Sequence, residues 1–287
     1  MPAFAADQPV PWLPPLPQSA APSSVFGDQF DPLGMQSAGP FASTDWRGFY
    51  VGGQFSYSDL YGDFSGSTQA PIAYSLRDTT LESEIDPSQW PVLGAADHSA
   101  PGFGGFVGYN TEYLTPNAKI VLGVEANYDQ AGLSLVAPNT PISRTVTDSS
   151  GNVDVVSITG SGQVSNLDFG TLRARAGWAA GNFLPYGFVG LALGRADVNI
   201  AETTVVEQNP PASGPCSASK TCEIFTFPGT AGKDGEWLYG LTVGAGLDFA
   251  LTHNVFLRGE YEYVQFQPVA GVTLDVNTVR VGGGIKF

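Results

Sequence analysis

The sequence contains few charged residues, and most of those it has are acidic. Charged side chains make up 14% of the 287 residues, against roughly 25% in ordinary soluble domains. Twelve Lys and Arg stand against 27 Asp and Glu, which gives a formal net charge of -15. Nucleic-acid binding requires basic side chains that neutralise phosphates, so this balance argues against nucleic acid as a partner.

Long hydrophobic runs are also missing. No stretch reaches the 18 unbroken apolar residues of a transmembrane helix. The strands of a membrane β-barrel leave no such signal, because apolar and polar residues alternate along them. The sequence therefore excludes a helical membrane protein and leaves a barrel open.

Cysteine is limited to Cys216 and Cys222, which lie in one Pro/Ser/Gly-rich stretch. A CxxC redox motif would need closer spacing, and a zinc site would need more ligands. In an exported protein this spacing favours a local disulfide. We therefore expect Cys216 and Cys222 to pair within one external loop.

The N-terminal 44 residues differ in composition from the rest. Residues 3–7 resemble the small-residue end of a secretory signal peptide, with Ala3 and Ala5 at the cleavage positions, although an ordinary alanine-rich terminus would look similar. The nine prolines in residues 1–44 predict an extended or disordered arm, which is expected to be periplasmic. The remainder, 45–287, is expected to form one β-domain.

Strict alternation begins near Trp46 and is clearest at the C-terminal end. There one face carries Val279, Val281, Gly283, Ile285 and Phe287. A period of two with one apolar face predicts a strand. Strands are predicted on this basis at 48–57, 102–112, 120–128, 172–178, 184–195, 237–249, 255–263 and 278–287. Segment 184–195 is apolar on both faces, so its inward face is not assigned.

The connections between these strands alternate in length. Three are short (114–119, 179–182 and 252–254), whereas 58–101, 129–162, 196–236 and 267–275 are mostly long. Short turns on one side and long loops on the other are typical of outer-membrane barrels, in which the turns are periplasmic. The predicted fold is an all-β, eight-stranded antiparallel up-and-down transmembrane β-barrel with long extracellular loops.

Aromatic residues fall near the predicted strand ends, as expected for rings that lie at membrane interfaces. The periplasmic girdle is predicted to contain Trp46, Tyr109, Trp178, Tyr186, Phe249 and Phe287. The outer girdle is predicted to contain Tyr57, Tyr128, Trp237 and Tyr263.

Several short motifs strengthen this interpretation: Trp46-Arg-Gly-Phe-Tyr-Val-Gly52, Gly170-Thr-Leu-Arg-Ala-Arg-Ala-Gly177, Leu184-Pro-Tyr186, Arg258-Gly-Glu-Tyr261 and Val281-Gly-Gly-Gly-Ile-Lys-Phe287. With them the chain resembles the outer-membrane β-barrel family of small porin-like surface antigens, over residues 45–287. The resemblance implies a Gram-negative outer-membrane location and contact with outer-membrane lipid and lipopolysaccharide. It also implies that Phe287 is the signal read by the barrel-assembly machinery.

Charged residues within the strands form the main candidate site. Seven fall on faces predicted to point into the barrel: Glu125, Arg173, Arg175, Arg258, Glu260, Glu262 and Arg280. The interior of an eight-stranded barrel is just wide enough for side chains to fill, so these groups should pair with one another. By strand order, Glu260 and Glu262 should reach Arg280, and Glu125 should reach Arg173 or Arg175.

Other sites find less support in the sequence. The acidic residues of 58–101 lack the spacing of a calcium loop and are best read as solvated. A lipid hydrolase would need His98 beside Ser99, but adjacent strand residues point to opposite faces. A haem site could use His98 and loop tyrosines.

No catalytic residue, metal or cofactor is therefore predicted. The predicted function is that of a non-enzymatic surface protein with an envelope-structural or interaction role, including possible envelope or self-association partners. A narrow pore or a ligand-binding barrel, for example for haem, is the alternative, and a lipid hydrolase is a remote one.

Overall fold

The computed structural model describes residues 44–287 except 117, 148, 150, 152 and 210–221. The chain divides into two units, Met1–Ala42 and Ser43–Phe287, and the described residues all belong to the second. The predicted arm, apart from Thr44, and Cys216 lie outside the described residues. The expected pairing of Cys216 with Cys222 therefore stays a prediction.

Nine strands account for most of the described chain, and three short helices occupy one connection. Their bounds are β1 (Gly48–Asp63), α1 (Gln69–Ser75), α2 (Leu81–Ile85), the 3-10 helix η1 (Pro87–Gln89), β2 (Ala95–Thr115), β3 (Ala118–Val136), β4 (Ile142–Thr147), β5 (Val153–Trp178), β6 (Phe183–Gln208), β7 (Glu223–Ala250), β8 (Val255–Phe266) and β9 (Thr273–Lys286).

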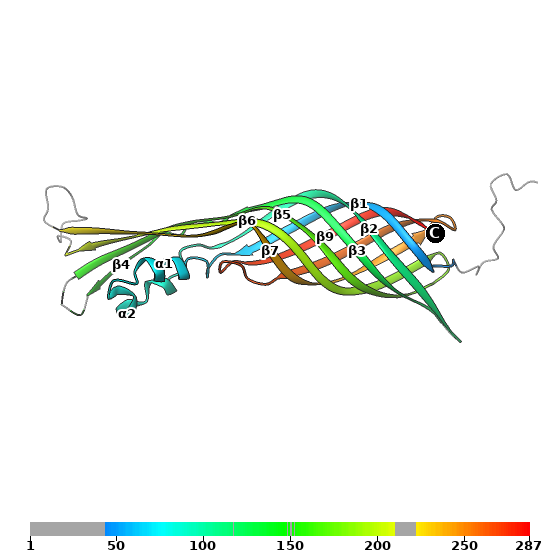
Figure 1. Ribbon diagram of the computed structural model, residues 1–287, viewed down its shortest axis with the longest axis horizontal. Helices are drawn as coiled ribbons and strands as arrows, with labels where there is room; N and C mark the ends of the chain where they lie inside the picture. Colours follow the sequence, from blue (N-terminus) through cyan, green and yellow to red (C-terminus); the bar gives the residue numbers. More distant parts are fainter. Residues whose placement is uncertain (1–43, 117, 148, 150, 152, 210–221) are drawn as a thin grey trace, which may run out of the picture. The chain divides into compact units, whose positions relative to one another are not determined.

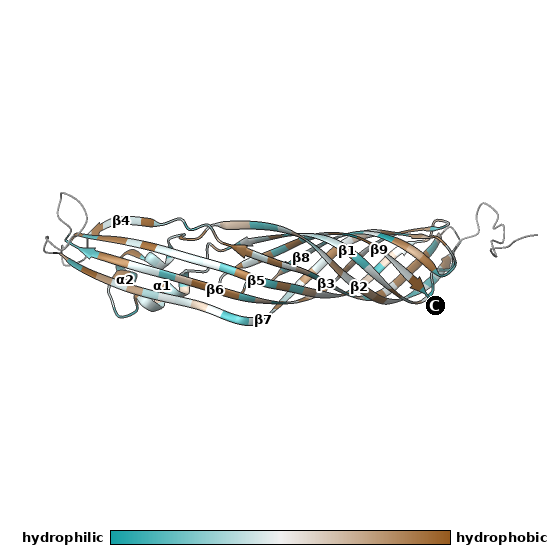
Figure 2. Cartoon of the chain, turned by 90° about the horizontal axis from the view of Figure 1, so that it is seen from above, coloured by the Kyte–Doolittle hydropathy of each residue, from teal (hydrophilic) through white to brown (hydrophobic). Residues whose placement is uncertain are grey.

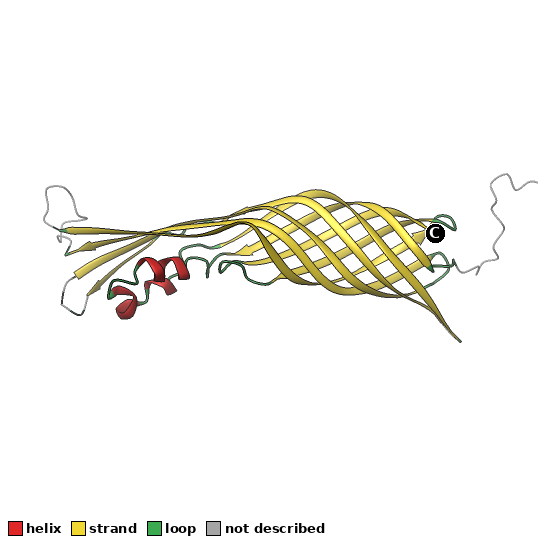
Figure 3. Cartoon of the chain, viewed as in Figure 1, coloured by secondary structure: helices red, strands yellow, loops and turns green. Residues whose placement is uncertain are grey.

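Eight of the strands form a closed ring in the order β1-β2-β3-β5-β6-β7-β8-β9 (Figures 1 and 3). All neighbours in the ring are antiparallel, and it closes where β9 pairs with β1. The ninth strand, β4, pairs only with β5 among the described strands and lies outside the ring. The predicted eight-stranded antiparallel barrel is confirmed.

The two ends of the barrel differ. At the end here called the turn end, short turns join β2 to β3, β5 to β6 and β7 to β8, and β1 starts where β9 finishes. At the other end β5, β6 and β7, which are 26, 26 and 28 residues long, run on beyond the ring (Figure 1). Their outer parts, with β4, are here called the extension.

The prediction of loops at 129–162 and 196–236 was therefore wrong for most of their length. The residues of these segments keep the alternation of the barrel strands: in β5 the side chains of Val156 and Ile158 are buried, and in β6 those of Val198 and Ile200. Valine, isoleucine and threonine fit a pleated, half-buried surface well. The strands continue because one face of the extension is covered by other parts of the chain.

The predicted long connection at 58–101 is present but shorter than expected, because strands occupy both of its ends. Strand β1 continues to Asp63, and residues 69–89 form the three helices before β2 begins at Ala95. The helices pack their apolar side chains on the extension. The joint core contains Ile72, Leu76, Leu81, Trp90, Val92, Val156, Ile158 and Val206.

Among the described helices, none is long and apolar enough to cross a membrane.

The outward surface of the barrel is apolar over the ring strands, and apolar and polar residues alternate along each strand (Figure 2). Two aromatic residues depart from the predicted girdle at the turn end. Trp46 is 2% exposed and Tyr186 is 5% exposed, and both lie inside the barrel. Trp46 precedes β1 and packs edge-on against Phe256 at 6.2 Å between ring centroids.

Glu202 of β6 couples the helices to the extension. Its carboxylate accepts hydrogen bonds from Ser75 Oγ of α1 at 3.1 Å and from Thr204 Oγ1 at 3.0 Å. Burial beneath the helix raises the pKa of this carboxyl above its ordinary value. An acid with a raised folded-state pKa stabilises the docked helix below its ordinary pKa, and that stability is lost as pH rises through the raised value.

We therefore expect α1 to detach more easily at high pH. Amide hydrogen-exchange protection factors for residues 69–75 should fall as the pH rises above the ordinary pKa of a glutamic acid and through the raised pKa of Glu202. Glu202→Gln should remove this pH dependence, whereas Glu223→Gln, at the exposed start of β7, should leave it intact. A Glu202→Gln variant that keeps the full pH dependence would show that another group is responsible.

Candidate functional site in the barrel interior

Nine charged side chains are buried together inside the ring, each at most 5% exposed. The four cations are Arg173 and Arg175 of β5, Arg258 of β8 and Arg280 of β9. The five carboxylates are Glu125 and Asp129 of β3, Asp248 of β7, and Glu260 and Glu262 of β8. This set is called the ionic core below.

Strand register brings three of the pairs together. Glu125 lies directly opposite Arg173, Asp248 opposite Arg258, and Glu260 opposite Arg280. Opposite charges in directly facing cross-strand positions attract, and here they do so out of reach of water. The alternation that turns apolar residues toward the outside thus turns these charges toward one another.

Other ion pairs connect strands that are not neighbours in the ring. Arg173 Nη1 lies 2.7 Å from Glu260 Oε1 and 3.3 Å from Glu262 Oε1, which joins β5 to β8. Arg280 Nη2 lies 2.5 Å from Asp129 Oδ2, which joins β9 to β3. Arg280 also forms an ion pair with Glu262. The ionic core is therefore one network that spans the lumen.

The half of the network nearer the turn end centres on two carboxylates. Arg258 lies 2.8 Å from both Glu125 Oε2, through Nη1, and Asp248 Oδ1, through Nε. Arg175 lies 3.2 Å from the same Glu125 oxygen and 2.6 Å from Asp248 Oδ2. Each arginine thus contacts two carboxylates, which is the arrangement that makes burial of a guanidinium tolerable.

Because carboxylates outnumber arginines by one, neutral donors complete the network. The hydroxyl of Tyr50 donates to Glu125 at 2.6 Å, and that of Tyr186 donates to Glu260 at 2.7 Å. Thr242 Oγ1 donates to Glu262 at 2.6 Å, and Gln54 Nε2 donates to Asp129 at 3.1 Å. These bonds solvate the excess negative charge in place of water.

Uncharged layers lie on both sides of the ionic core. Toward the turn end, Trp46, Tyr50, Phe106 and Phe256 form an aromatic cluster with Val121, Leu184 and Ala250. Toward the extension, an apolar cluster that includes Leu133, Leu167, Phe169 and Phe266 fills the barrel. The interior is therefore filled by side chains at each of these depths.

The guanidinium groups also stack on the rings around them. Arg258 lies 4.0 Å above the Phe106 ring, Arg173 lies 4.2 Å above the Phe188 ring, and Arg175 lies 3.7 Å above the Tyr186 ring. A desolvated cation over an aromatic face gains about 2 kcal/mol. Aromatic residues on the lumen face thus hold the arginine planes in place as well as filling space.

All seven charged residues selected from the sequence lie in the ionic core, and two carboxylates of that core were missed. Asp129 continues the inward series Glu125, Asn127, Asp129 on β3, but the sequence analysis ended the strand before it. Asp248 lies in the predicted strand 237–249 but was not selected as a candidate. The signal for both was the unbroken alternation.

The remaining candidates lie elsewhere. Ser99 Oγ donates to Asp59 Oδ1 at 3.0 Å across the β1–β2 pair, and no hydrogen bond between described residues joins Ser99 to His98. Among the described residues no cluster of His, Cys, Asp and Glu could hold a metal ion. The side chain of Phe287 is 74% exposed on the outside of the turn end, and its backbone N–H donates to the Phe49 carbonyl at 2.8 Å.

The acidic residues of 58–101 lie on β1, α2 and β2 and in the connections between elements. Glu82 of α2 accepts a hydrogen bond from the backbone N–H of Ser88 at 3.3 Å, and Glu84 accepts one from Ser149 Oγ at 2.6 Å. Asp59 and Asp97 lie on β1 and β2. Glu82 therefore joins α2 to η1, and Glu84 joins α2 to the segment that contains Ser149.

The family model of the outer membrane protein beta-barrel domain matches residues 32–287 of the sequence. The chain belongs to this family. Its members are named for the membrane in which they lie, and the chain is accordingly a β-barrel protein of the Gram-negative outer membrane. The resemblance seen in the sequence motifs is confirmed.

Curated relatives of this outer-membrane barrel carry matching names. The chain is 28% identical over 254 residues to a 22 kDa outer membrane protein of Rhizobium leguminosarum bv. viciae. The aligned region covers 84% of this chain and 78% of the relative. It is 31% identical over 128 residues to a 25 kDa outer-membrane immunogenic protein of Brucella canis. That second match covers 41% of this chain and 46% of the relative, so it spans about half the length of the Brucella protein.

Solved structures of bacterial barrels are similar at low identity. Ail, the attachment invasion locus protein of Yersinia pestis, aligns with a TM-score of 0.33 at 15% identity, covering 84% of this chain and 99% of Ail. OprG from Pseudomonas aeruginosa aligns with a TM-score of 0.37 at 13% identity, covering 85% of this chain and 98% of OprG.

The orientation of an outer-membrane barrel follows from its connections. Short turns of such barrels face the periplasm and longer loops face the exterior. The turn end of this barrel is therefore periplasmic, and the extension and its helices lie outside the cell. The ionic core lies between them, within the ring that crosses the membrane.

Proposed function

We propose that the chain is a non-enzymatic surface protein with an envelope-structural or interaction role. In this proposal the barrel is a closed anchor, and the extension and its helices make the external contacts. The observation that carries it is the combination of a filled interior with an ordered external structure. Relatives from Brucella are named as immunogenic proteins of the outer membrane, which supports exposure at the surface.

The filled interior argues against the alternative of a pore. An eight-stranded barrel has an interior just wide enough for side chains to fill, whereas porins of sixteen or more strands leave an aqueous channel. Here the nine charged side chains of the ionic core are at most 5% exposed, and uncharged clusters lie above and below them. Ions crossing the barrel would have to break several buried ion pairs.

We expect no stable conductance from the folded protein. In planar bilayers the purified chain should produce no porin-like current steps, because the lumen is occupied at every level described above. A sixteen-stranded porin in the same bilayers provides the positive control. Large, stable current steps from this chain would overturn the proposal in favour of the pore.

The external role can be tested by removing the helices. We expect replacement of residues 67–90 by a short Gly/Ser linker to leave the barrel folded, because α1 and α2 pack on the extension and not on the ionic core. The measurement is chemical cross-linking on intact cells. Cells that carry the variant should lose the cross-links to surface partners that the full chain forms. Unchanged cross-linking would show that the helices take no part in the interaction.

A further inference from the structure

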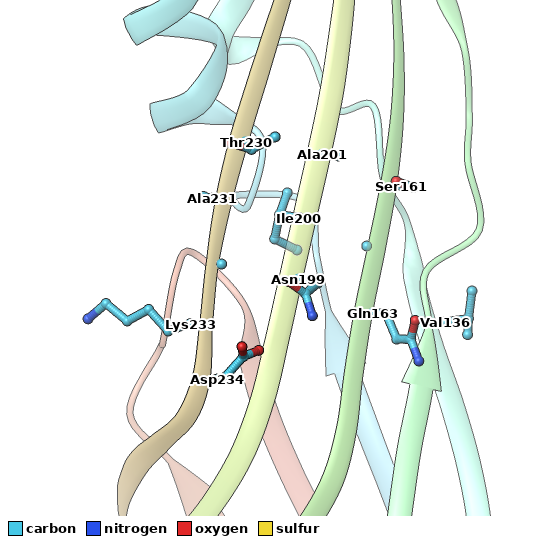
Figure 4. A pocket seen from close by; sticks show the side chains of 12 residues that line it. Val136, Ser161, Gln163, Asn199, Ile200, Ala201, Thr230, Ala231, Lys233 and Asp234 are labelled. Carbon is cyan, nitrogen blue, oxygen red and sulfur yellow. The ribbon is translucent and has the colours of Figure 1, made fainter.

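Three adjoining hollows follow the outward face of β5, β6 and β7 where the barrel passes into the extension. The first, of about 680 Å³, is lined by Leu172, Leu191, Leu193, Tyr239, Trp237 and Arg195 among others. The second, of about 240 Å³, shares Arg195 and Asp168 with the first. The third, of about 450 Å³, begins at Asn199, the next outward residue of β6 after Asp197 (Figure 4).

Two β-bulges lie along this groove, at its second hollow. The β5–β6 register shifts between Ser165 and Asp168, and the β6–β7 register shifts beside Ala196. Bulges bend a strand and increase its twist, and they recur next to functional sites. Since both shifts flank the same short part of β6, the neighbouring strands bend on either side of it.

Asp197 fixes both bulges. Its carboxylate accepts a hydrogen bond from Asn166 Nδ2 at 3.0 Å and another from the Gly235 backbone N–H at 2.7 Å. Asn166 and Gly235 both have positive φ values, of 56° and 64°. The hydrogen bond from Asn166, followed by that from Gly235, lowers the pKa of this carboxyl. The groove thus has a built shape.

The chemistry of the groove changes along its length. Its barrel end is a wall of exposed apolar and aromatic side chains, Leu172, Leu191 and Tyr239, which faces the bilayer. Its extension end carries amides and hydroxyls: Gln163 of β5 lies directly opposite Asn199 of β6, and Ser161 and Thr230 line the same hollow. Figure 4 shows Gln163 and Asn199 on neighbouring strands. A ligand that fits both ends has an apolar part and a hydroxyl-rich part.

The charges of the groove favour a neutral saccharide, and not a phosphate group, as the hydroxyl-rich part of the ligand. Lys233 Nζ is paired with Glu236 at 2.9 Å. Arg195 lies directly opposite Asp168 and next but one to Asp197 along β6. With each cation accompanied by a carboxylate, the groove offers no net positive charge to an anion.

We propose that this groove binds a glycolipid of the surrounding outer leaflet. The acyl chains lie on the wall formed by Leu172, Leu191 and Tyr239, and the saccharide headgroup is bound by Gln163, Asn199 and Ser161. This proposal rests on the proposed function in one respect, which is that the extension lies outside the cell. The commitment to a membrane lipid follows from the continuity of the groove with the bilayer-facing wall of the barrel.

The test measures binding of rough lipopolysaccharide, which carries a short core saccharide, to the full chain in phospholipid nanodiscs. The double variant Gln163→Leu with Asn199→Leu removes two amides at about one hydrogen bond each and should weaken binding about tenfold. Gln265→Leu is the matched control, because Gln265 is an exposed outward amide of β8 outside the groove, and it should bind like the native chain. Ala201→Trp, which fills the third hollow, should reduce binding without touching the amides.

Three further probes distinguish the sources of binding. Lipid A, which lacks the core sugars, should bind the native chain weakly, with about the affinity that rough lipopolysaccharide has for the double variant. Dephosphorylated rough lipopolysaccharide should bind the native chain nearly as well as the phosphorylated form. Free core oligosaccharide should bind more weakly than the lipid-linked form. Each of four results would overturn the proposal. They are lipid A binding as tightly as rough lipopolysaccharide, loss of binding on dephosphorylation, free core oligosaccharide binding as tightly as the lipid-linked form, and unchanged binding by the double variant. Conductance of the same samples reports separately on the closed anchor.

Discussion

Arg280→Ala should lower the free energy of unfolding by about 3–5 kcal/mol, the usual cost of removing one partner from a buried ion pair. Arg280 contacts Asp129, Glu260 and Glu262, and its side chain is about 1% exposed. Its removal leaves these carboxylates with fewer partners in a core where carboxylates already outnumber arginines. Urea unfolding of the barrel in detergent micelles, followed by tryptophan fluorescence, measures the loss.

Three companion variants make this result specific. Glu262→Gln alone should cost much less, because it removes the surplus negative charge of the ionic core and keeps the shape of the side chain. Added to Arg280→Ala, it should recover part of the loss, since contacting groups in one network are not additive. Arg77→Ala, at an exposed arginine of the helical segment, should change stability by about 1 kcal/mol or less. Strict additivity of the double variant, or a larger cost for Glu262→Gln than for Arg280→Ala, would contradict the network.

Deletion of Phe287 should nearly abolish insertion into the outer membrane of living cells. The resemblance of the final segment to that of related barrels implies that this residue is read by the assembly machinery. Its side chain is 74% exposed, so folding itself does not need it for packing. The same variant, refolded from urea into detergent or lipid vesicles, should therefore reach a stability close to that of the full chain. The measurement is the amount of heat-modifiable barrel in outer-membrane fractions, compared with the yield of refolding.

The matched control is Ile285→Ala. Ile285 is also an exposed outward residue of β9, so it loses a similar lipid contact while the terminal Phe287 remains. It should insert normally in cells. Equal failure of the Phe287 deletion in cells and in refolding would mean that the residue acts through stability and not as a signal.

The sequence revealed the parts of the fold on which the membrane imposes a pattern. Within the bilayer each strand must turn apolar residues outward, and this period of two located all eight ring strands and the inward faces of Arg173 and Glu260. Beyond the bilayer that constraint ends. The extension strands keep the alternation of the barrel, but the helices are held by contacts such as Ile72 with the strand core, which join segments far apart in the sequence and leave no local pattern.

The same reasoning explains the errors inside the ring. Tyr186 lies in a segment that is apolar on both faces, so hydropathy does not distinguish lipid from the interior. Its hydroxyl donates to Glu260, and only the three-dimensional arrangement shows that an aromatic residue was needed there. Asp129 was missed because β3 extends beyond the predicted strand.

The closure of the ring through β1 and β9 determines when the wall can form. Ser58 and Thr278 share a hydrogen bond of 2.9 Å although 220 positions separate them along the chain. Contacts of such long range form slowly, since the entropy of a large loop is lost before they are made. Until β9 has been synthesised and delivered, β1 has an open edge whose unpaired backbone groups would bind any other strand. Pairing of β9 with β1 therefore removes both open edges in one step, and until then the exported chain is exposed to pairing with other strands.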